Sequence, residues 1–146
     1  MHPSVHAQTN PDKPAVIMAG GGETIGYAEL DRRSNRVAQL IRSRGIGIGE
    51  TIAICMENHS WFFALTWGAQ RSGVHYVCIS SRLTAPEIAY ILADSGARLV
   101  FGSVYLGATL DEVAKRAPDV PQLRFDTPGA LSAEDALATL GPEAWP

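Results

Sequence analysis

The side chains best placed for chemistry lie in two short polar segments, each of which follows an apolar run. Residues 57–60 (Glu-Asn-His-Ser) follow the run 52–56, and residues 80–82 (Ser-Ser-Arg) follow the run 74–79. If both runs are parallel strands, these segments lie at the carboxyl edge of one sheet, where open α/β sheets bind their ligands. They are therefore the candidate binding loops. Arg82 is their only cation, although a solvated residue or a structural ion pair is the commoner role of such an arginine.

The histidines lack a visible catalytic partner. His59 lies beside the expected start of a helix and His75 opens a strand, whereas His2 and His6 belong to the N-terminal arm. A general base must reach the proton that it removes, and the sequence shows no group that would orient it. We therefore expect His59 to be a helix-cap or partly buried residue, and His75 to be a packing residue.

Two cysteines, Cys55 and Cys78, fall inside the apolar runs. A nucleophilic thiol needs a nearby base or a helix N-terminus to lower its pKa, and neither is evident at these positions. Free cysteine is among the most frequently buried residue types. Core packing is therefore expected for both thiols, and two cysteines inside predicted strands fit a reducing compartment.

A helix-length apolar segment, residues 61–69, connects the two apolar runs. Two short strands joined by one helix must be parallel, with a right-handed crossover. Because aromatic side chains occur all around this helix, we expect burial on more than one side and a central place for the whole unit. Core packing is the expected role of the aromatic residues, and an apolar ligand channel is the alternative. These residues are Trp61, Phe62, Phe63 and Trp67.

The flanking sequence predicts further elements on both sides of this unit. A β-hairpin is expected over residues 15–19 and 23–26, and apolar residues at helical spacing predict an amphipathic helix over 27–44. Capping boxes at Thr84–Glu87 and Thr109–Glu112 indicate two later helix starts. The later elements are helices at 83–95, 109–117 and 132–140, and strands at 98–101 and 123–125.

Alternating strands and helices indicate an α/β fold in three layers, with a mostly parallel sheet, helices on both faces and an N-terminal β-hairpin. The 146 residues suffice for one domain. We expect residues 1–14 to form an irregular arm and residues 15–126 to form the α/β scaffold. Residues 127–146 are expected to form a short helix and a tail.

Common catalytic motifs are absent from the sequence. It contains no G-x-x-x-x-G-K-[ST] phosphate loop, and no G-x-S-x-G, H-E-x-x-H or C-x-x-C motif. Residues 45–49 (Gly-Ile-Gly-Ile-Gly) follow a predicted helix and precede a strand, which is the reverse of a dinucleotide-binding loop, so a simple turn is expected. We assign no catalytic, cofactor-binding or metal-binding residue.

Composition and charge limit the kinds of partner and the cellular location that we expect for this protein. A net charge of −3 argues against a nucleic-acid partner, because phosphate binding needs a basic field. No apolar stretch approaches the length of a transmembrane segment, and the N-terminus lacks the pattern of a signal peptide. A cytoplasmic location is expected, and the glycosylation triplet at residues 58–60 is interpreted as a chance match.

Three segments, in order, resemble motifs of adenylate-forming enzymes. Residues 25–38 (IGYAELDRRSNRVA) resemble the pattern TYxELxxxxNRxA, and residues 71–80 (RSGVHYVCIS) resemble xxGAxYVPIN. Residues 81–98 (SRLTAPEIAYILADSGAR) are similar to the xRLTxxEIxYILxDSGAR stretch of bacterial acyl-CoA synthetases. The chain departs from these patterns at Gly26, where Ser or Thr is usual, and at Cys78, where Pro is usual.

The resemblance implies the N-terminal segment of an ATP-dependent fatty-acid–CoA ligase. Such an enzyme joins a fatty or other carboxylic acid to ATP as an acyl-adenylate and then transfers the acyl group to coenzyme A, with Mg²⁺ assisting. The chain stops before the ATP-binding loop of that family, so we expect no cofactor to bind to it and no activity from it alone. A stand-alone interaction module is the alternative, paired either with a second copy or with a complementing C-terminal fragment.

Overall fold

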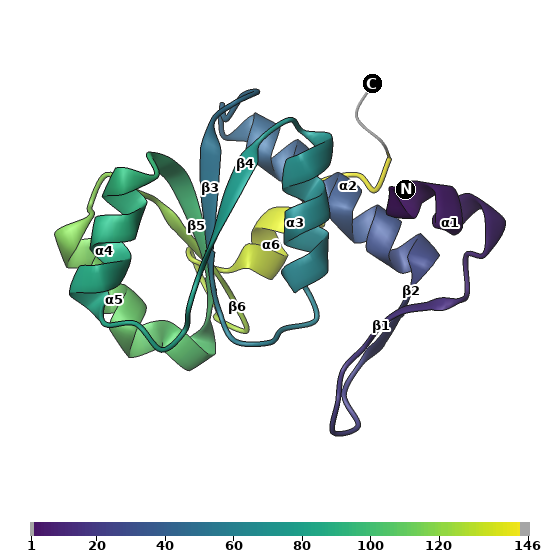
Figure 1. Cartoon of the computed structure of the whole chain (residues 1–146), viewed down its shortest axis with the longest axis horizontal. Coiled ribbons are helices and arrows are strands. Elements are labelled where there is room, and N and C mark those ends of the chain that lie inside the picture. Colours follow the sequence, from purple (N-terminus) through teal and green to yellow (C-terminus); the bar gives the residue numbers. More distant parts are fainter. Residues whose placement is uncertain (1, 144–146) are drawn as a thin grey trace.

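The computed structural model describes residues 2–143 and contains a four-stranded parallel sheet in the order β4-β3-β5-β6 (Figure 1). Strands β3 (Thr51–Cys55) and β4 (His75–Ile79) pair in register along their whole length. Strand β5 (Ala97–Ser103) pairs with the other side of β3, and β6 (Gln122–Phe125) pairs with β5. The expected parallel pairing of the two apolar runs is confirmed.

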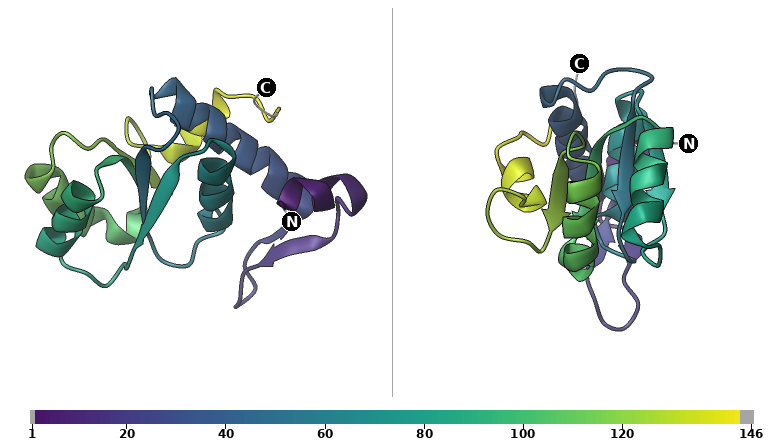
Figure 2. Two further views of the ribbon diagram at one scale, coloured as in Figure 1. Left: turned by 45° about the horizontal axis from the view of Figure 1, so that its top comes forward. Right: turned by 90° about the vertical axis from the view of Figure 1, so that its left-hand side faces the viewer.

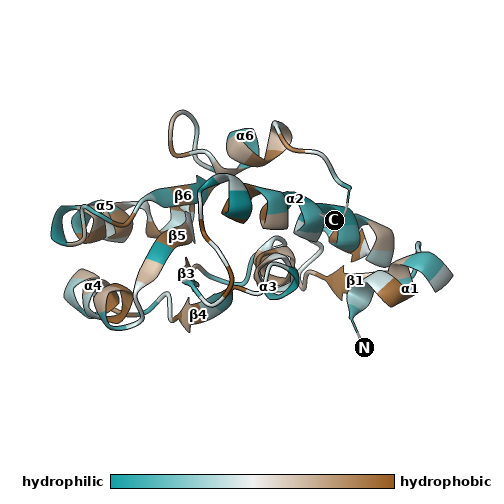
Figure 3. Ribbon diagram, turned by 90° about the horizontal axis from the view of Figure 1, so that it is seen from above, coloured by the Kyte–Doolittle hydropathy of each residue, from teal (hydrophilic) through white to brown (hydrophobic). Residues whose placement is uncertain are grey.

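Helices cover both faces of the sheet, as predicted. On one face, α2 (Tyr27–Ser43), α3 (Phe62–Arg71) and α6 (Ala133–Ala138) pack over the strands. On the other face lie α4 (Ala85–Asp94) and α5 (Gly107–Arg116). Figure 3, seen from above, separates the two helical layers. No helix within residues 2–143 combines the length and the apolar character needed to cross a membrane.

Strand β3 supplies apolar side chains to both layers. Ile52 and Ile54 join the core under α2, α3 and α6, whereas Ala53 and Cys55 join the core under α4 and α5. All four residues are fully buried. Period-two alternation explains this division, because successive side chains of a strand point to opposite faces. The expected core position of Cys55 is confirmed.

The predicted hairpin is present as a separate two-stranded sheet of β1 (Pro14–Ile17) and β2 (Thr24–Gly26). Its strands pair antiparallel, and Figure 2 shows its turn projecting away from the body of the protein. Gly20 and Gly21 make the turn with φ angles of 80° and 82°. Glycine adopts this left-handed conformation without the steric penalty of a Cβ atom.

The expectation of an irregular arm over residues 1–14 is wrong for most of that segment. Residues Pro3–Thr9 form the helix α1, which packs beside α2, and β1 already begins at Pro14. The His2 imidazole Nδ1 accepts a hydrogen bond from the Ser4 backbone amide, and Pro3 occupies the first helical position. A proline is favourable there because the first amide of a helix has no partner in the helix.

The two predicted capping boxes have different outcomes. The carboxylate of Glu87 accepts hydrogen bonds of 2.7 Å from both the amide and the hydroxyl of Thr84, so the first box is confirmed. The second is wrong, because α5 begins at Gly107 and Thr109 lies inside it. A 3₁₀ turn over Val104–Leu106 leads directly into α5 and supplies the first hydrogen bonds without a side-chain cap.

The connecting helix α3 is buried differently from the expectation. Its buried positions are mostly small or aliphatic, whereas Phe63 is 49% exposed and Trp67 is half-buried. Strand β4 also lies at the edge of the sheet rather than at its centre, which leaves His75 and Cys78 exposed. Core packing was therefore the wrong prediction for both residues. Sequence pattern does not reveal strand order, and an edge strand has neighbours on one side only.

A close contact between α2 and α3 depends on Gly68. A Cβ atom at this position would lie 2.6 Å from the Cβ of Val37 and 3.0 Å from the Ser34 carbonyl oxygen. Because β-branched Val37 is fully buried and stiff, it cannot move aside cheaply. The absence of a side chain at Gly68 thus lets the two helices approach, and this explains why the small residues of α3 face inward.

We predict that Gly68→Ala lowers the free energy of unfolding by about 1–3 kcal/mol through overpacking, although alanine is the better helix former. Gly107→Ala is the matched control, because a Cβ atom at this helical position meets nothing within 4 Å. It should be neutral or stabilise by up to about 1 kcal/mol. Urea unfolding of both variants measures the difference, and equal effects would contradict the close helix contact.

Candidate functional site

The carboxyl edge of the sheet brings together polar side chains from three loops, but they are bonded to one another. After β3, the Glu57 carboxylate accepts a hydrogen bond of 2.5 Å from the hydroxyl of Ser103, the last residue of β5. Ser103 is fully buried, so no substrate reaches its oxygen. This pair therefore joins β3 to β5 and does not form an activated nucleophile.

His59 joins the β3–α3 loop to the end of β6. Its Nε2 lies 3.0 Å from a carboxylate oxygen of Asp126, and its Nδ1 accepts a hydrogen bond of 3.2 Å from the Trp61 backbone amide. The ring also lies against Phe125, with 5.2 Å between centroids. Because Nδ1 accepts, the proton of the neutral ring is on Nε2 and points to Asp126. Both ring nitrogens of His59 therefore have hydrogen-bond partners within the chain, as expected for a helix-cap residue and not for a free general base.

The second candidate loop does not complete a site with the first. Arg82 is exposed, and its backbone amide donates to the Ser80 hydroxyl at 3.3 Å. The hydrogen bonds of Glu57 and His59 lead to β5 and β6, on the side of β3 opposite to Arg82. Among the described residues, no group of three acidic, histidine or cysteine side chains is placed to hold a metal ion. The sequence located the loops correctly but not their partners.

A cleft of about 560 Å³ opens between the hairpin and the start of α3. Strand β1 and its turn form one wall, and the other wall combines an apolar pair of phenylalanines with the polar β3–α3 loop. Phe62 and Phe63 line this cleft, so the alternative role of the aromatic residues, an apolar ligand channel, stays open for these two. Sequence reasoning missed the contribution of the hairpin. The lining residues are Val16, Ile17, Met18, Ala19, Asn58, His59, Phe62 and Phe63.

Arg33 of α2 holds the hairpin in place beside α3. Its guanidinium pairs with Glu23, which directly precedes β2 at the turn of the hairpin, and with Glu29, one helical turn earlier in α2, at 2.9 Å. The same group lies 4.7 Å from the ring centroid of Trp61, in a cation–π contact. One side chain thus links α2, β2 and the start of α3. The only sequence signal for it is the i,i+4 spacing of Glu29 and Arg33.

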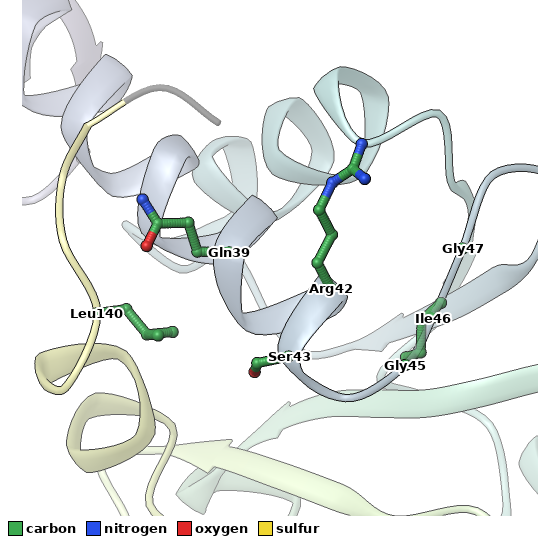
Figure 4. Close-up of a pocket in the computed structure, with 7 residues that line it drawn as sticks. All are labelled: Gln39, Arg42, Ser43, Gly45, Ile46, Gly47 and Leu140. Carbon is green, nitrogen blue, oxygen red and sulfur yellow. The ribbon is translucent and has the colours of Figure 1, made fainter. Parts of the chain in front are cut away.

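The glycine-rich segment is a turn, as predicted. Helix α2 ends at Ser43, and Gly45 and Gly49 have left-handed φ angles of 71° and 82° before β3 begins. A cavity of about 460 Å³ lies here; Figure 4 shows Leu140 beside Gln39, with the Arg42 guanidinium directed away from Leu140. Its wall includes the carboxyl end of a helix, which repels phosphate. The cavity is lined by Gln39, Arg42, Ser43, Gly45, Ile46, Gly47 and Leu140.

Comparison with known proteins identifies relatives over nearly the whole chain. The family described as AMP-binding enzyme matches residues 4–145. A fatty acid–[acyl-carrier-protein] ligase of Streptomyces coeruleorubidus is 34% identical over 80% of this chain and 22% of its own length. A long-chain-fatty-acid–CoA ligase of Mycobacterium tuberculosis is 31% identical over 90% of this chain and 26% of its own length. The chain therefore spans about a quarter of the length of these relatives.

Solved structures agree with the sequence comparison. The inhibitor-bound N-terminal domain of the Mycobacterium tuberculosis protein FACL13 superposes with a TM-score of 0.87 at 26% identity. The match covers 99% of this chain and 36% of that domain. The three-layer arrangement and the separate hairpin therefore match a known domain and are not peculiar to this chain.

The Arg33 pairs predict a pH-dependent stability. The hydrogen bond from Arg33 lowers the pKa of Glu23. At Glu29, burial alone would raise the pKa, but the hydrogen bonds from Arg33 and Arg32 outweigh burial, so the pKa of Glu29 is lowered as well. Carboxylates with lowered pKa values stabilise the fold above their unfolded pKa, near 4.3, and this contribution is lost as pH falls through the folded values.

Arg33→Met should therefore cost about 1–2 kcal/mol at neutral pH, and this deficit should shrink below about pH 4. Arg44→Met, at an exposed position after the same helix, is the control and should change stability by less than about 0.5 kcal/mol. Urea unfolding at the two pH values measures the deficit. If it is the same at both, the carboxylate pairs do not anchor the hairpin.

Proposed function

Because the chain belongs to the family of AMP-binding enzymes, we propose that it forms the N-terminal part of an ATP-dependent ligase for fatty acids or other carboxylic acids. The match over residues 4–145 is the observation that carries this proposal. The carboxylate attacks the α-phosphate of ATP to give an acyl-adenylate and pyrophosphate. A thiol, of coenzyme A or of an acyl-carrier protein, then displaces AMP to give a thioester.

The described residues act in this proposal as a scaffold and not as the reaction centre. Their donor set does not fit a nucleotide with Mg²⁺: Glu57 and Asp126 at the carboxyl edge are already bonded to Ser103 and His59, and the described residues contain no group of three potential metal ligands. The glycine turn follows the carboxyl end of a helix, and the amides of Gly45, Gly47 and Gly49 already donate to oxygens of the chain itself. ATP, Mg²⁺ and coenzyme A therefore bind through other segments of the enzyme, and these 146 residues alone do not catalyse the reaction.

A second candidate is an interaction module, and the exposed edge of the sheet favours it. Strand β4 lies at the margin of the sheet, with Tyr76 45% exposed and Phe63 of α3 49% exposed nearby. An unpaired edge flanked by apolar side chains is a surface for association, either with a complementing C-terminal fragment or with a second copy. Two unpaired cysteines, Cys55 and Cys78, fit the cytoplasm as the location of either form.

The proposed function predicts a working chimera. Residues 4–145 should replace the matching segment of the Mycobacterium tuberculosis long-chain-fatty-acid–CoA ligase and keep fatty-acid-dependent pyrophosphate release within about tenfold of the parent. The purified chain by itself should show no ATP–pyrophosphate exchange with a panel of fatty acids.

A chimera carrying Phe101→Asp is the control, because a charge at this fully buried position should unfold the segment and abolish release. A folded but inactive chimera would contradict the ligase role. Exchange activity in the chain alone would contradict its proposed dependence on other segments.

A further inference from the structure

The two edge strands of the parallel sheet differ in whether another segment of the chain pairs with their outer side. At the β6 edge, the Arg124 backbone amide donates to the Leu131 carbonyl at 2.7 Å, and Arg124 forms a bridge with Ser132. The chain therefore covers this edge with its own loop. At the opposite edge, no residue in the range 2–143 pairs with the outer side of β4. Only the β4 edge is left open by the described chain, and Figure 3 shows β4 at the outer margin of the sheet, next to β3.

Strand β4 also lacks the usual protection of an open edge. Natural edge strands are blunted by charged side chains, proline or bulges. Residues 75–79 (His-Tyr-Val-Cys-Ile) include no acidic or basic side chain apart from the histidine, and they pair with β3 without a bulge. Apolar surface continues from the strand onto α3, where a hollow of about 290 Å³ is lined in part by Tyr76, Cys78 and Trp67.

The hydrogen-bond pattern shows which backbone groups face outward. The His75 amide donates to the Glu50 carbonyl at 2.8 Å, so the backbone of His75 faces β3. Because this orientation alternates along a strand, Val77 also faces β3, whereas Tyr76 and Cys78 direct their amides and carbonyls away from the sheet. Cys78 stands where the resembled motif has proline, which cannot donate. In this chain the outer edge therefore has a complete set of donors.

From these features we infer that two copies of this chain pair through their β4 strands, antiparallel and centred on Val77. In this register Tyr76 of one copy lies opposite Cys78 of the other, and each such pair exchanges two backbone hydrogen bonds. The two sheets become one continuous sheet with a two-fold axis at Val77, the commonest symmetry of homo-oligomers.

A second copy fits the charge of this edge. The two-fold axis pairs the strand with a second copy of itself, so a strand that carried charges of one sign would repel its partner, whereas residues 75–79 contain no Asp, Glu, Lys or Arg. The pairing also covers Tyr76 and Cys78 beside the apolar hollow against α3. This inference goes beyond the ligase proposal and does not depend on it, because it uses only the geometry of the edge.

The first test is the mass of the chain in solution, with a matched pair of variants at one position. The unmodified chain should elute with twice its monomer mass of 15.6 kDa in size-exclusion chromatography with light scattering. Cys78→Pro removes an outward donor but no hydrogen bond to β3, so it should give a folded monomer. Cys78→Ala removes the thiol and keeps the donor, so it should remain a dimer. Circular dichroism checks that both variants fold.

The second test is the register, read by disulfide formation in the Cys78→Ala background with oxidised glutathione as the oxidant. Cysteines introduced by Val77→Cys face each other across the axis, with about 4.5 Å between Cα atoms, which a disulfide can span. Those introduced by His75→Cys would be roughly 14 Å apart and should not cross-link. Cys55 should not form a disulfide in either variant, because it is buried and burial raises its pKa to about 11.

Each outcome decides the inference. A dimer that Cys78→Pro dissociates, with cross-linking of Val77→Cys but not of His75→Cys, supports it. A monomeric wild-type chain at its highest soluble concentration overturns it and leaves the edge to another segment of a longer protein. A dimer that survives Cys78→Pro, or equal cross-linking at both positions, also overturns it, because the copies would then meet elsewhere.

Discussion

A strand that is buried on both of its faces needs a helical layer on each side, and β3 is such a strand. Its residues from Ile52 to Cys55 are 0% exposed and divide alternately between two separate cores. Burying four side chains contributes several kcal/mol in total, but only while both layers are in place. The positions of α2, α3 and α6 on one face, and of α4 and α5 on the other, follow from this requirement.

This constraint also explains how much of the fold could be predicted from the sequence. The apolar runs around residues 52–56 and 74–79 indicate parallel strands because a single helix connects them. Strand order is not local information, so the edge position of β4 and the exposure of Cys78 could not be read from those runs. Helix α1 was missed because its cap is the imidazole of His2, which is not one of the usual capping residues.

For the polar side chains of the carboxyl edge, too, the sequence predicts the position in the chain but not the partners in space. The sequence places Glu57 and His59 in the correct loop, since that loop follows a buried strand. Their partners, Ser103 and Asp126, lie 46 and 67 residues away along the chain. Only the folded chain shows that these groups satisfy each other. The geometry therefore favours a scaffold role at this edge, in agreement with relatives of whose length the chain covers about a quarter.

The apolar surfaces that remain open lie beside this scaffold and not within it. The cleft under the hairpin is held by Arg33, and the outer edge of β4 is flanked by the exposed Phe63 and Tyr76. Both surfaces lie next to α3, where Phe63 is exposed and Phe62 and Trp67 are partly buried. The aromatic side chains of this helix therefore border both surfaces that are available for association.

Amide hydrogen exchange of the isolated chain, followed residue by residue by NMR, tests the central role of β3 most directly. If burial on both faces holds the fold together, the amides of Ile52–Cys55 and of the neighbouring Val100 and Phe101 exchange slowest, at the rate of global unfolding. The hairpin amides exchange earlier, by local opening. Exchange of the β3 amides as fast as those of the hairpin would contradict the account.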